Sequence, residues 1–507
     1  MKKIFRIMFN KVTIVLLLLL VQLTFIVTTI LYITQSAIYL YIGLQLLSLV
    51  VIVHVVSKND NPSYKLVWAV AILLFPLFGG LFYLLLGRSH LSKRNRAKLD
   101  EYRQFAGLMG EQSEGAWEAL HQIEPSLSLQ SRFIDQTGDY RLFRGTQTRF
   151  YPFTEEIFPV MLDEIAKAER FILLEYFIIQ PGVMWDSVLA VLERKAAEGV
   201  EVLLMYDGFG SLTTVPGNFD KQLRAKGIQC TEFSPLVAWL DMTMNNRDHR
   251  KICVVDGNVG FCGGYNLADE YINVVEKYGH WKDTGIMLKG DGVWNLTLMF
   301  FQLWRYCNTT HADISAYRPT RRYPDDGFVQ PFSDSPLDSV QVSQNTFLQA
   351  INRANRYIYI TSPYLIIDNE LITSLCIAAR SGVDVRIVVP HIGDKWYVHM
   401  LTQSFYQQLV DNGVKIYEYT PGFIHAKMFV SDDHVAMVGT INMDYRSFYL
   451  HHECGVMLYH NSQVANIRED IQRTIGISEE ITTDFYAKKP VFKRLLAAVL
   501  RLLAPMF

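Results

Sequence analysis

The chain has 507 residues, 50% of them apolar, and a formal net charge of -2 at neutral pH. A chain of this length exceeds the size at which one hydrophobic core keeps growing, so we expect more than one folding unit. The balanced charge gives no overall reason to expect nucleic acid or another polyanion as partner, so any anion site has to be sought locally.

The N-terminal region is strongly apolar. Residues 12–57 contain no Asp, Glu, Lys or Arg, and a second uncharged run covers residues 66–87. A spanning helix needs about 20 apolar residues, so the first run has room for two and the second for a third. A cleaved signal peptide is disfavoured because its apolar core has only about 7 to 15 residues. We therefore predict a helical membrane region, residues 1–88, with two or three hydrophobic segments.

Basic residues flank this region on both sides, and the positive-inside rule places both flanks in the cytoplasm. Three full spans would separate the flanks, whereas two spans and a re-entrant third segment would keep them together. Pro76, Gly79 and Gly80 supply a break inside the third segment. We predict a multi-pass membrane protein in which a basic linker and lead-in, residues 89–145, and everything after it are cytoplasmic.

Beyond about residue 145, apolar runs of strand length alternate with longer mixed stretches, a pattern typical of βα units. Segments recur in the same order along the chain, pairing 170–179 with 356–367, 196–207 with 378–390, 223–235 with 409–421 and 249–266 with 425–442. Each copy is domain-sized rather than a solenoid repeat. We predict an α/β protein with two tandem copies of one domain, related by a pseudo-twofold axis, each a mainly parallel or mixed sheet flanked by helices.

The predicted first domain covers residues 146–310 and the second covers residues 328–484. A polar, turn-rich linker, residues 311–327, joins them. The last segment, residues 485–507, has apolar side chains at helical spacing and basic ones elsewhere, so we predict an amphipathic basic helix. This helix would lie in an anionic membrane interface or, as the alternative, dock onto protein.

The six cysteines have neither CxxC spacing nor an obvious disulfide framework. We expect free thiols in a reducing compartment, mostly buried in cores. These are Cys230, Cys253, Cys262, Cys307, Cys376 and Cys454.

The pattern His, one residue, Lys, four residues, Asp occurs twice, at His249, Lys251 and Asp256 and again at His425, Lys427 and Asp432. Residues i and i+2 of a strand share a face, so each histidine projects together with its lysine. Two imidazoles and two ammonium groups around one cleft suit an anion, and phosphate above all. We expect no metal, because Lys does not ligate the common divalent metals and the sequence has no evident zinc cluster.

This pair of motifs resembles the phospholipase D superfamily. The segments GGYN at 263–266 and GTIN at 439–442 match the family's Gly-x-x-Asn positions. More narrowly, the chain is similar to the bacterial cardiolipin synthases over most of its length, as in YDGFGS, HWKDT, PGFIHAK and GTINMDYRSF. The family's second motif is usually followed by Asn-Phe-Glu, whereas residues 451–453 read HHE, which keeps only the carboxylate.

The resemblance implies phosphatidyl transfer through a phosphohistidine intermediate, without a cofactor. His249 would be the nucleophile and His425 the general acid and base. The phosphate would be bound by both motif lysines and by Asn266 and Asn442.

Carboxylates that orient the imidazoles are also implied. Asp283 is assigned to His249 and Glu453 to His425, because each follows that histidine within its own copy. The family signature adds Asp256 and Asp432 to the catalytic set, although an Asp that closes a strand often binds turn backbone instead.

The function implied is the joining of two phosphatidylglycerol molecules into cardiolipin with release of glycerol, at a bacterial cell membrane that supplies anionic phospholipids. One alternative is a membrane phospholipase D that forms phosphatidic acid with water. Another is a non-catalytic membrane scaffold, which the two complete motifs disfavour. A nuclease is disfavoured by the apolar N-terminal region and the balanced charge. The oligomeric state and the acceptor and acyl-chain preferences stay open.

Overall fold

The computed structural model describes residues 35–59, 61–75, 115–234, 246–308, 313–338, 340–485 and 488–506, with Thr24, Gly79, Gly80 and Tyr83. The chain divides into two compact units. The smaller unit contains the N-terminal helices, and the larger runs over Lys93–Pro235 and Asn246–Arg501. The first predicted hydrophobic segment lies outside the described residues.

The smaller unit contains α3 (Gln35–Val56) and α4 (Pro62–Leu74), which pack against each other. The Asn61 side chain caps α4 by accepting a hydrogen bond from the Ser63 N–H at 2.9 Å. Phe75 leaves the helical conformation directly before Pro76, as expected for a residue preceding proline. Among the described residues, no helix combines the length and apolar character needed to cross a membrane.

Two mixed sheets dominate the described part of the larger unit. The first has the order β1 (Thr146–Tyr151), β9 (Gly285–Gly290), β7 (Val259–Gly263), β6 (Ile252–Val255), β2 (Phe171–Tyr176), β3 (Glu201–Asp207) and β4 (Gln229–Phe233). The second has the order β10 (Phe328–Asp334), β19 (His451–Tyr459), β17 (Val435–Gly439), β16 (Met428–Ser431), β11 (Tyr357–Thr361), β13 (Asp384–Pro390), β14 (Lys415–Tyr419) and β20 (Glu479–Glu480).

The strand orders of the two sheets correspond position by position, apart from the extra β20 at one edge. Along these two orders, parallel pairing occurs in β2–β3–β4 and in β11–β13–β14, and the remaining neighbours are antiparallel. A further short strand of the second sheet, β5 (Arg247–Asp248), lies off the order and pairs in parallel with β19. The sheets are therefore mixed, which is one of the two predicted forms, and they are not mainly parallel.

Tight hairpins after the motif strands cause this difference. Asp256 and Gly257 have φ of 53° and 70°, and Asp432 and Asp433 have φ of 54° and 67°. Positive φ at two successive residues is typical of a type I′ turn, for which Asp-Gly is a strong signal. Here each turn belongs to a three-residue loop, because Val255 pairs with Val259 and Ser431 with Val435. Each motif strand is thus followed by an antiparallel partner, β7 or β17.

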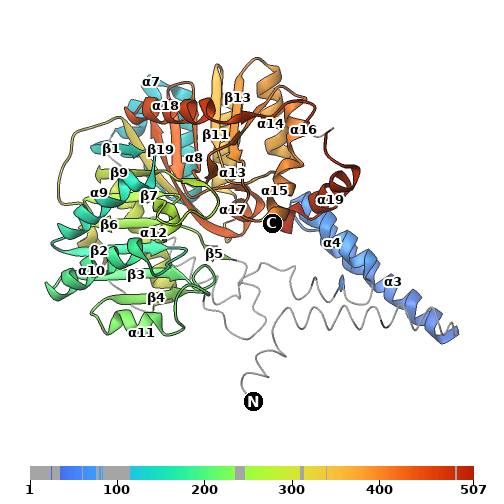
Figure 1. Ribbon diagram of the computed structural model, residues 1–507, viewed down its shortest axis with the longest axis horizontal. Helices are drawn as coiled ribbons and strands as arrows, with labels where there is room; N and C mark the ends of the chain where they lie inside the picture. The colour runs from blue at the N-terminus through green and yellow to red at the C-terminus, as the bar shows by residue number, and fades with distance from the viewer. Residues whose placement is uncertain are drawn as a thin grey trace. The chain divides into compact units, whose positions relative to one another are not determined.

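Helices cover the faces of both sheets (Figure 1). Around the first sheet lie α9 (Thr154–Ala166), α10 (Val183–Ala197), α11 (Phe219–Arg224) and α12 (Val293–Cys307). Around the second lie α13 (Val342–Arg353), α14 (Asn369–Arg380), α15 (Trp396–Gln403), α16 (Tyr406–Val410), α17 (Tyr445–Tyr449) and α18 (Gln463–Gly476), with α7 (Ala116–Ile123) and α8 (Pro125–Gly138) leading in. Helix α12 contacts strands of both sheets and is buried nearly all round.

The predicted C-terminal segment contains α19 (Val491–Leu502). Arg501 holds it to the larger unit by donating to the Ser404 carbonyl at 3.2 Å and stacking over the Phe405 ring. The side chains of Val491, Phe492, Leu495 and Val499 are mostly exposed. In the described part of the chain, the helix thus contacts protein through Arg501 and the buried Ala497, while these four apolar side chains are left mostly exposed.

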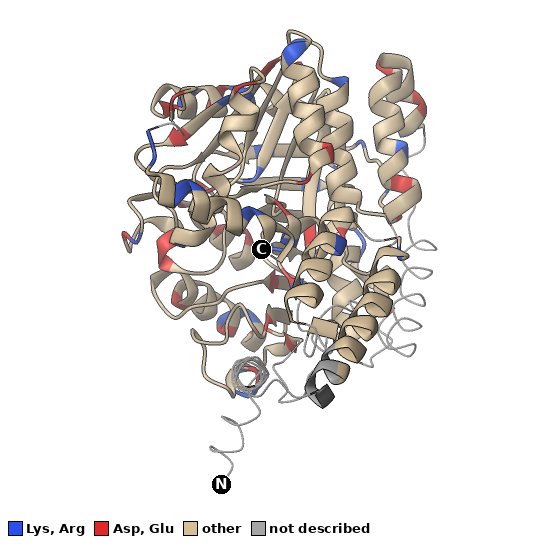
Figure 2. Cartoon of the chain, turned by 90° about the vertical axis from the view of Figure 1, so that its right-hand side faces the viewer, with Lys and Arg blue, Asp and Glu red and all other residues tan. Residues whose placement is uncertain are grey.

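The surface charges are of mixed sign and the thiols are mostly buried. Lys and Arg alternate with Asp and Glu over the side of the larger unit seen in Figure 2, without a face of one sign. All six cysteines are free, which confirms the prediction of free thiols, and four are buried: Cys230, Cys253, Cys262 and Cys454.

Candidate active site

His425 is positioned by a short strand from the other copy of the repeat. Strand β8 (His280–Lys282) pairs in parallel with β15 (Gly422–Ile424), directly before His425. The main-chain N–H of His425 donates to the Lys282 carbonyl at 2.7 Å. The next residue, Asp283, consequently meets the imidazole, and its Oδ2 lies 2.6 Å from His425 Nδ1.

His249 is held in the same way, with the copies exchanged. Strand β5 (Arg247–Asp248) pairs in parallel with the start of β19. The main-chain N–H of His249 donates to the His452 carbonyl at 2.9 Å. The next residue, Glu453, places its two carboxylate oxygens 2.9 and 3.0 Å from His249 Nδ1.

The assignment of Asp283 to His249 and of Glu453 to His425 was therefore wrong, because each histidine is paired with the carboxylate of the other copy. The parallel pairing of β5 with β19 and of β8 with β15 causes the crossing. A carboxylate on Nδ1 favours the tautomer with the proton on that atom, which leaves the Nε2 lone pair available. The two motifs thus come together in one place.

Hydroxyl and amide groups fix the carboxylates. Glu453 is fully buried and accepts from Thr440 Oγ1 at 2.5 Å and from Ser447 Oγ at 2.7 Å. Asp283, also fully buried, accepts from the Thr284 N–H at 2.8 Å. The sequence reasoning missed these partners, although Thr440 and Ser447 stand in the GTINMDYRSF segment that it singled out.

Both motif lysines are buried, and each Nζ donates to the main-chain carbonyl of its own motif histidine. Burial lowers the pKa of Lys251 to about 8 and the pKa of Lys427 to about 7. Burial raises the pKa of Asp283 to about 7, although the Lys427 charge opposes this shift. The lysines therefore carry protons that are easily lost near neutral pH.

The two motif histidines and the two motif lysines influence one another electrostatically. Burial is the main cause that lowers the pKa of His249 well below its ordinary value, and the charges of Lys251, Lys427 and His425 lower it further. Burial and the same two lysines lower the pKa of His425. Without substrate, both imidazoles are therefore neutral at physiological pH.

The two predicted phosphate-binding asparagines differ in their surroundings. Asn266 accepts from the Ile178 N–H at 3.0 Å through Oδ1 and donates to the Tyr271 hydroxyl at 2.6 Å through Nδ2. Within the described part of the chain, the buried Asn442 Oδ1 has no hydrogen-bond partner. Of these two asparagines, it is Asn442 whose side chain keeps a buried oxygen without a partner among the described residues.

Asp256 and Asp432 both bind main-chain amides, which is the alternative that the sequence favoured for an Asp at the end of a strand. The Asp256 carboxylate accepts from the main-chain N–H groups of Glu169, Arg170 and Phe171 at 2.7 to 3.0 Å. The Asp432 carboxylate accepts likewise from the N–H groups of Asn355, Arg356 and Tyr357. Each closes its motif strand at the end remote from the histidine and ties it to the start of β2 or β11.

A buried ion pair that the sequence reasoning did not predict lies behind the first motif. Arg250, the variable residue between His249 and Lys251, lies 2.6 Å from Glu175 and 3.4 Å from Asp248. All three charged side chains are buried. The Glu175 carboxylate thus neutralises the Arg250 guanidinium.

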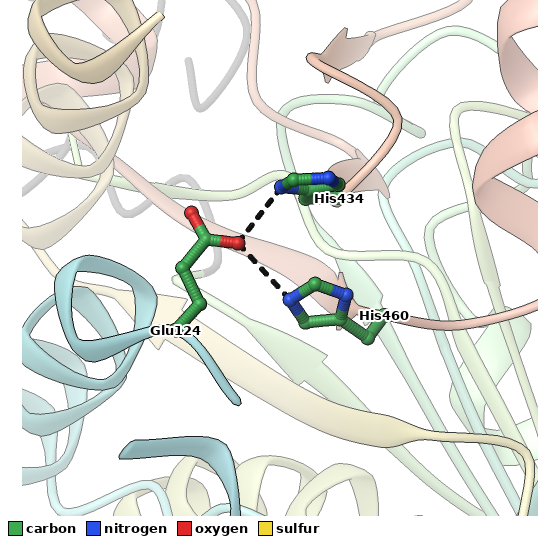
Figure 3. Close-up of side chains that lie close together, drawn as sticks. All are labelled: Glu124, His434 and His460. Atoms are coloured by element: carbon green, nitrogen blue, oxygen red, sulfur yellow. Dashed lines mark hydrogen bonds and ion pairs between the residues drawn. The ribbon is translucent and has the colours of Figure 1, made fainter. Parts of the chain in front are cut away.

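Among the described residues, the fold also assembles two groups of two histidines and one glutamate, which the sequence did not predict. One consists of His249, His451 and Glu453. The other is Glu124, His434 and His460, where Glu124 Oε2 lies 2.8 Å from His434 Nδ1 and 3.0 Å from His460 Nε2 (Figure 3). His434 follows the far end of β16 from His425, so this second group is separate from the motif site.

Comparison with known proteins identifies the family. A family model described as "Cardiolipin synthase, PLD-like domain" matches residues 347–475, and one described as "Phospholipase D-nuclease N-terminal" matches residues 46–88. A cardiolipin synthase of Alkalihalophilus pseudofirmus is 34% identical over 89% of this chain and 90% of its own. This chain belongs to the cardiolipin synthase family. An uncharacterized protein of Streptococcus mutans is 38% identical over 90% of this chain and 99% of its own.

The fold agrees with this membership. The crystal structure of phosphatidylserine synthase from Haemophilus influenzae matches 75% of this chain and 100% of its own, with a TM-score of 0.56 and 12% sequence identity. At such low identity the match shows the shared α/β architecture. The family models and the curated relatives confirm the recognition of a cardiolipin synthase of the phospholipase D superfamily.

Proposed function

We propose that this member of the cardiolipin synthase family transfers a phosphatidyl group from one phosphatidylglycerol molecule to another, forming cardiolipin and releasing glycerol. The observation that carries the proposal is the crossed arrangement of the motif histidines. Each imidazole has a buried carboxylate from the other copy on its Nδ1, and both lysines act on both rings. An anionic phosphodiester fits between such groups.

In the first half-reaction, His249 Nε2 attacks phosphorus, so a P–N bond forms while the bond from phosphorus to the headgroup glycerol oxygen breaks. His425 gives a proton to the departing oxygen. His425 is neutral without substrate, but a bound phosphate anion favours its protonated form. The product is a phosphatidyl-histidine and free glycerol.

In the second half-reaction, His425 takes the proton of a headgroup hydroxyl on a second phosphatidylglycerol. The freed oxygen attacks phosphorus, the P–N bond breaks, and His249 is restored. Lys251, Lys427, Asn266 and Asn442 stabilise charge on the non-bridging oxygens. Asp283 and Glu453 orient the rings. The choice of His249 as nucleophile follows the family resemblance.

The domain division that we propose keeps the predicted boundaries. Two phospholipase D-like domains, residues 146–310 and 328–484, are related by a pseudo-twofold axis and joined by the linker 311–327. The corresponding strand orders of the two sheets support this.

We further propose a cell-membrane protein with a multi-pass region over residues 1–88, the basic lead-in 89–145 and cytoplasmic catalytic domains. The segment 485–507 would bind anionic lipid through the exposed apolar face of α19 and its Lys and Arg residues. The substrates are anionic phospholipids, and the formal net charge of -2 gives no support to a nucleic-acid partner.

The direct test is to incubate the purified chain in detergent with phosphatidylglycerol as its only phospholipid, and to measure lipids by mass spectrometry and free glycerol enzymatically. We expect cardiolipin and glycerol in equal amounts. Phosphatidic acid without cardiolipin would identify a hydrolase, and an unchanged lipid pool would identify a scaffold. The His249→Ala variant serves as the inactive control.

A further inference from the structure

His451 occupies a special place beside the first motif histidine. Residues 451 and 453 lie on one face of β19, so His451 and Glu453 point the same way. The rings of His451 and His249 have centroids 5.5 Å apart, and His451 Nδ1 lies 3.7 Å from Glu453 Oε1. In the described part of the chain, this buried Nδ1 has no hydrogen-bond partner. His451 Nδ1 thus lies at ion-pair distance from the Glu453 carboxylate but beyond the length of a normal hydrogen bond.

The spacing of these atoms suits a small divalent metal ion. The three ligand atoms of His249, His451 and Glu453 lie within 4.8 Å of one another. From Glu453 Oε1, His249 Nδ1 is 2.9 Å away and His451 Nδ1 is 3.7 Å away. Bonds of about 2.0 Å in a tetrahedral zinc site place ligand atoms about 3.3 Å apart, which is midway between these two distances. Two imidazoles and a carboxylate are also a ligand set that zinc prefers.

We infer that His249, His451 and Glu453 form a zinc-binding site whose occupation inhibits the enzyme. The inference of inhibition rests on the proposed function, in which His249 Nε2 attacks phosphorus. Zinc bound to Nδ1 displaces the ring proton from that atom, and the neutral imidazole then carries its proton on Nε2. The lone pair needed for attack is lost, and Glu453 binds the metal instead of orienting the ring.

The second motif lacks this site. Trp281 stands two residues before Asp283, just as His451 stands two residues before Glu453, and its ring lies 5.3 Å from the His425 ring. An indole does not ligate zinc. The metal would therefore act on the first motif histidine alone.

The activity test compares zinc inhibition of the full-length chain with that of His451→Asn, each relative to its own zinc-free rate. His434→Ala is the matched control, because it removes a ligand from the Glu124, His434 and His460 group only. We expect at least a tenfold higher inhibitory zinc concentration for His451→Asn and an unchanged one for His434→Ala. Equal sensitivity of His451→Asn and the natural chain would overturn the site, as would a loss of inhibition in His434→Ala.

A second measurement does not depend on turnover. Co²⁺ is added to the full-length His434→Ala chain, and the visible absorption of four-coordinate cobalt is recorded. We expect the bands in His434→Ala and their loss in the His434→Ala/His451→Asn double variant. Bands that persist in the double variant would contradict the site. The two proposals can fail separately. If cobalt binding depends on His451 but the natural chain forms no cardiolipin in the absence of zinc, the proposed function is contradicted and the metal site is not.

Discussion

The two motif copies have the same framework but bury different side chains around it. In both, the histidine is anchored to the other copy, the lysine binds its own histidine carbonyl, and the aspartate holds main-chain amides. Behind the first motif lies the ion pair of Arg250 with Glu175. At the corresponding place in the second, Thr361 Oγ1 donates to the Ala426 carbonyl at 3.1 Å. The features that the two copies share are those that position the imidazoles. The side chains behind the motif strands differ, because the first copy has an ion pair where the second has a neutral hydrogen bond.

The rings also have different neighbours. His425 lies among Tyr271, Trp281 and Phe423, with ring centroids 5.3 to 5.9 Å away. His249 lies against Phe177 and His451. The repeat alone makes the two histidines equivalent, and these neighbours give a physical basis for unequal roles.

The largest difference between the two halves is expected in covalent trapping. With a phosphatidyl substrate whose leaving group needs no proton, His425→Ala and Asp283→Asn should still form the adduct on His249. Glu453→Gln should suppress it by about 10²- to 10⁴-fold, because the ring loses its orienting carboxylate. Mass spectrometry of peptides after acid-free quenching measures the adduct.

An adduct on the peptide containing His425 would reverse the nucleophile assignment. Suppression by Asp283→Asn with normal trapping in Glu453→Gln would contradict the crossed pairing.

The second-largest difference is expected in the free energy of unfolding, when matching buried side chains behind the two motifs are replaced. Arg250→Met leaves the buried Glu175 without its partner and should cost about 3 to 5 kcal/mol of folding free energy. Thr361→Val removes one neutral hydrogen bond at the matching place and should cost about 0.5 to 1.5 kcal/mol. Chemical denaturation in detergent, followed by circular dichroism, compares them. Equal denaturation midpoints for the two variants would contradict the buried ion pair of Arg250 with Glu175.

Much of this arrangement follows from the sequence. The repeated motif, its strands and the α/β class could be predicted, because each depends on local spacing and alternation. The crossed pairing of Asp283 and Glu453 could not, because it depends on strands β5 and β8 pairing with the other copy across long sequence distances. The hairpin after Asp256 could have been predicted, since Asp-Gly between apolar strands is a turn signal.

His451 shows the same limit. Its departure from the usual pattern is visible in the sequence, but its approach to His249 depends on the pairing of β19 with β5. The segment HHE could therefore be singled out from the sequence. That His451 lies beside His249, where both could bind one metal ion, could not be predicted.

The pH dependence should reflect the two lysines. Each ammonium is present below its pKa and lost as the pH rises through it, near 7 for Lys427 and 8 for Lys251. kcat/KM should therefore fall above neutral pH, because the neutral amine stabilises the phosphate less. Lys427→Arg keeps its charge, so its alkaline limb should move upward by about one pH unit. Lys289→Arg, whose lysine pairs with Glu164 outside the site, is the control. If the alkaline limb of the kcat/KM profile stays at the same pH in Lys427→Arg, then loss of the Lys427 proton does not cause the fall in activity.

The smallest effect is expected from chelation. The groups proposed to stabilise phosphate charge in both halves are lysines and asparagines, so EDTA should not lower the rate of cardiolipin formation. A salt control at equal ionic strength accounts for effects on the anionic lipid. A loss that one specific metal restores would contradict the proposed chemistry.

The central claim is that both motifs form one site. It is tested most directly by the initial rates of cardiolipin formation in His249→Ala, His425→Ala and the double variant. A shared site predicts that each single variant loses at least about 10³-fold and that the double variant is little worse, because the groups act as a unit. Roughly half the natural rate in either single variant is the result for independent sites and would contradict the account.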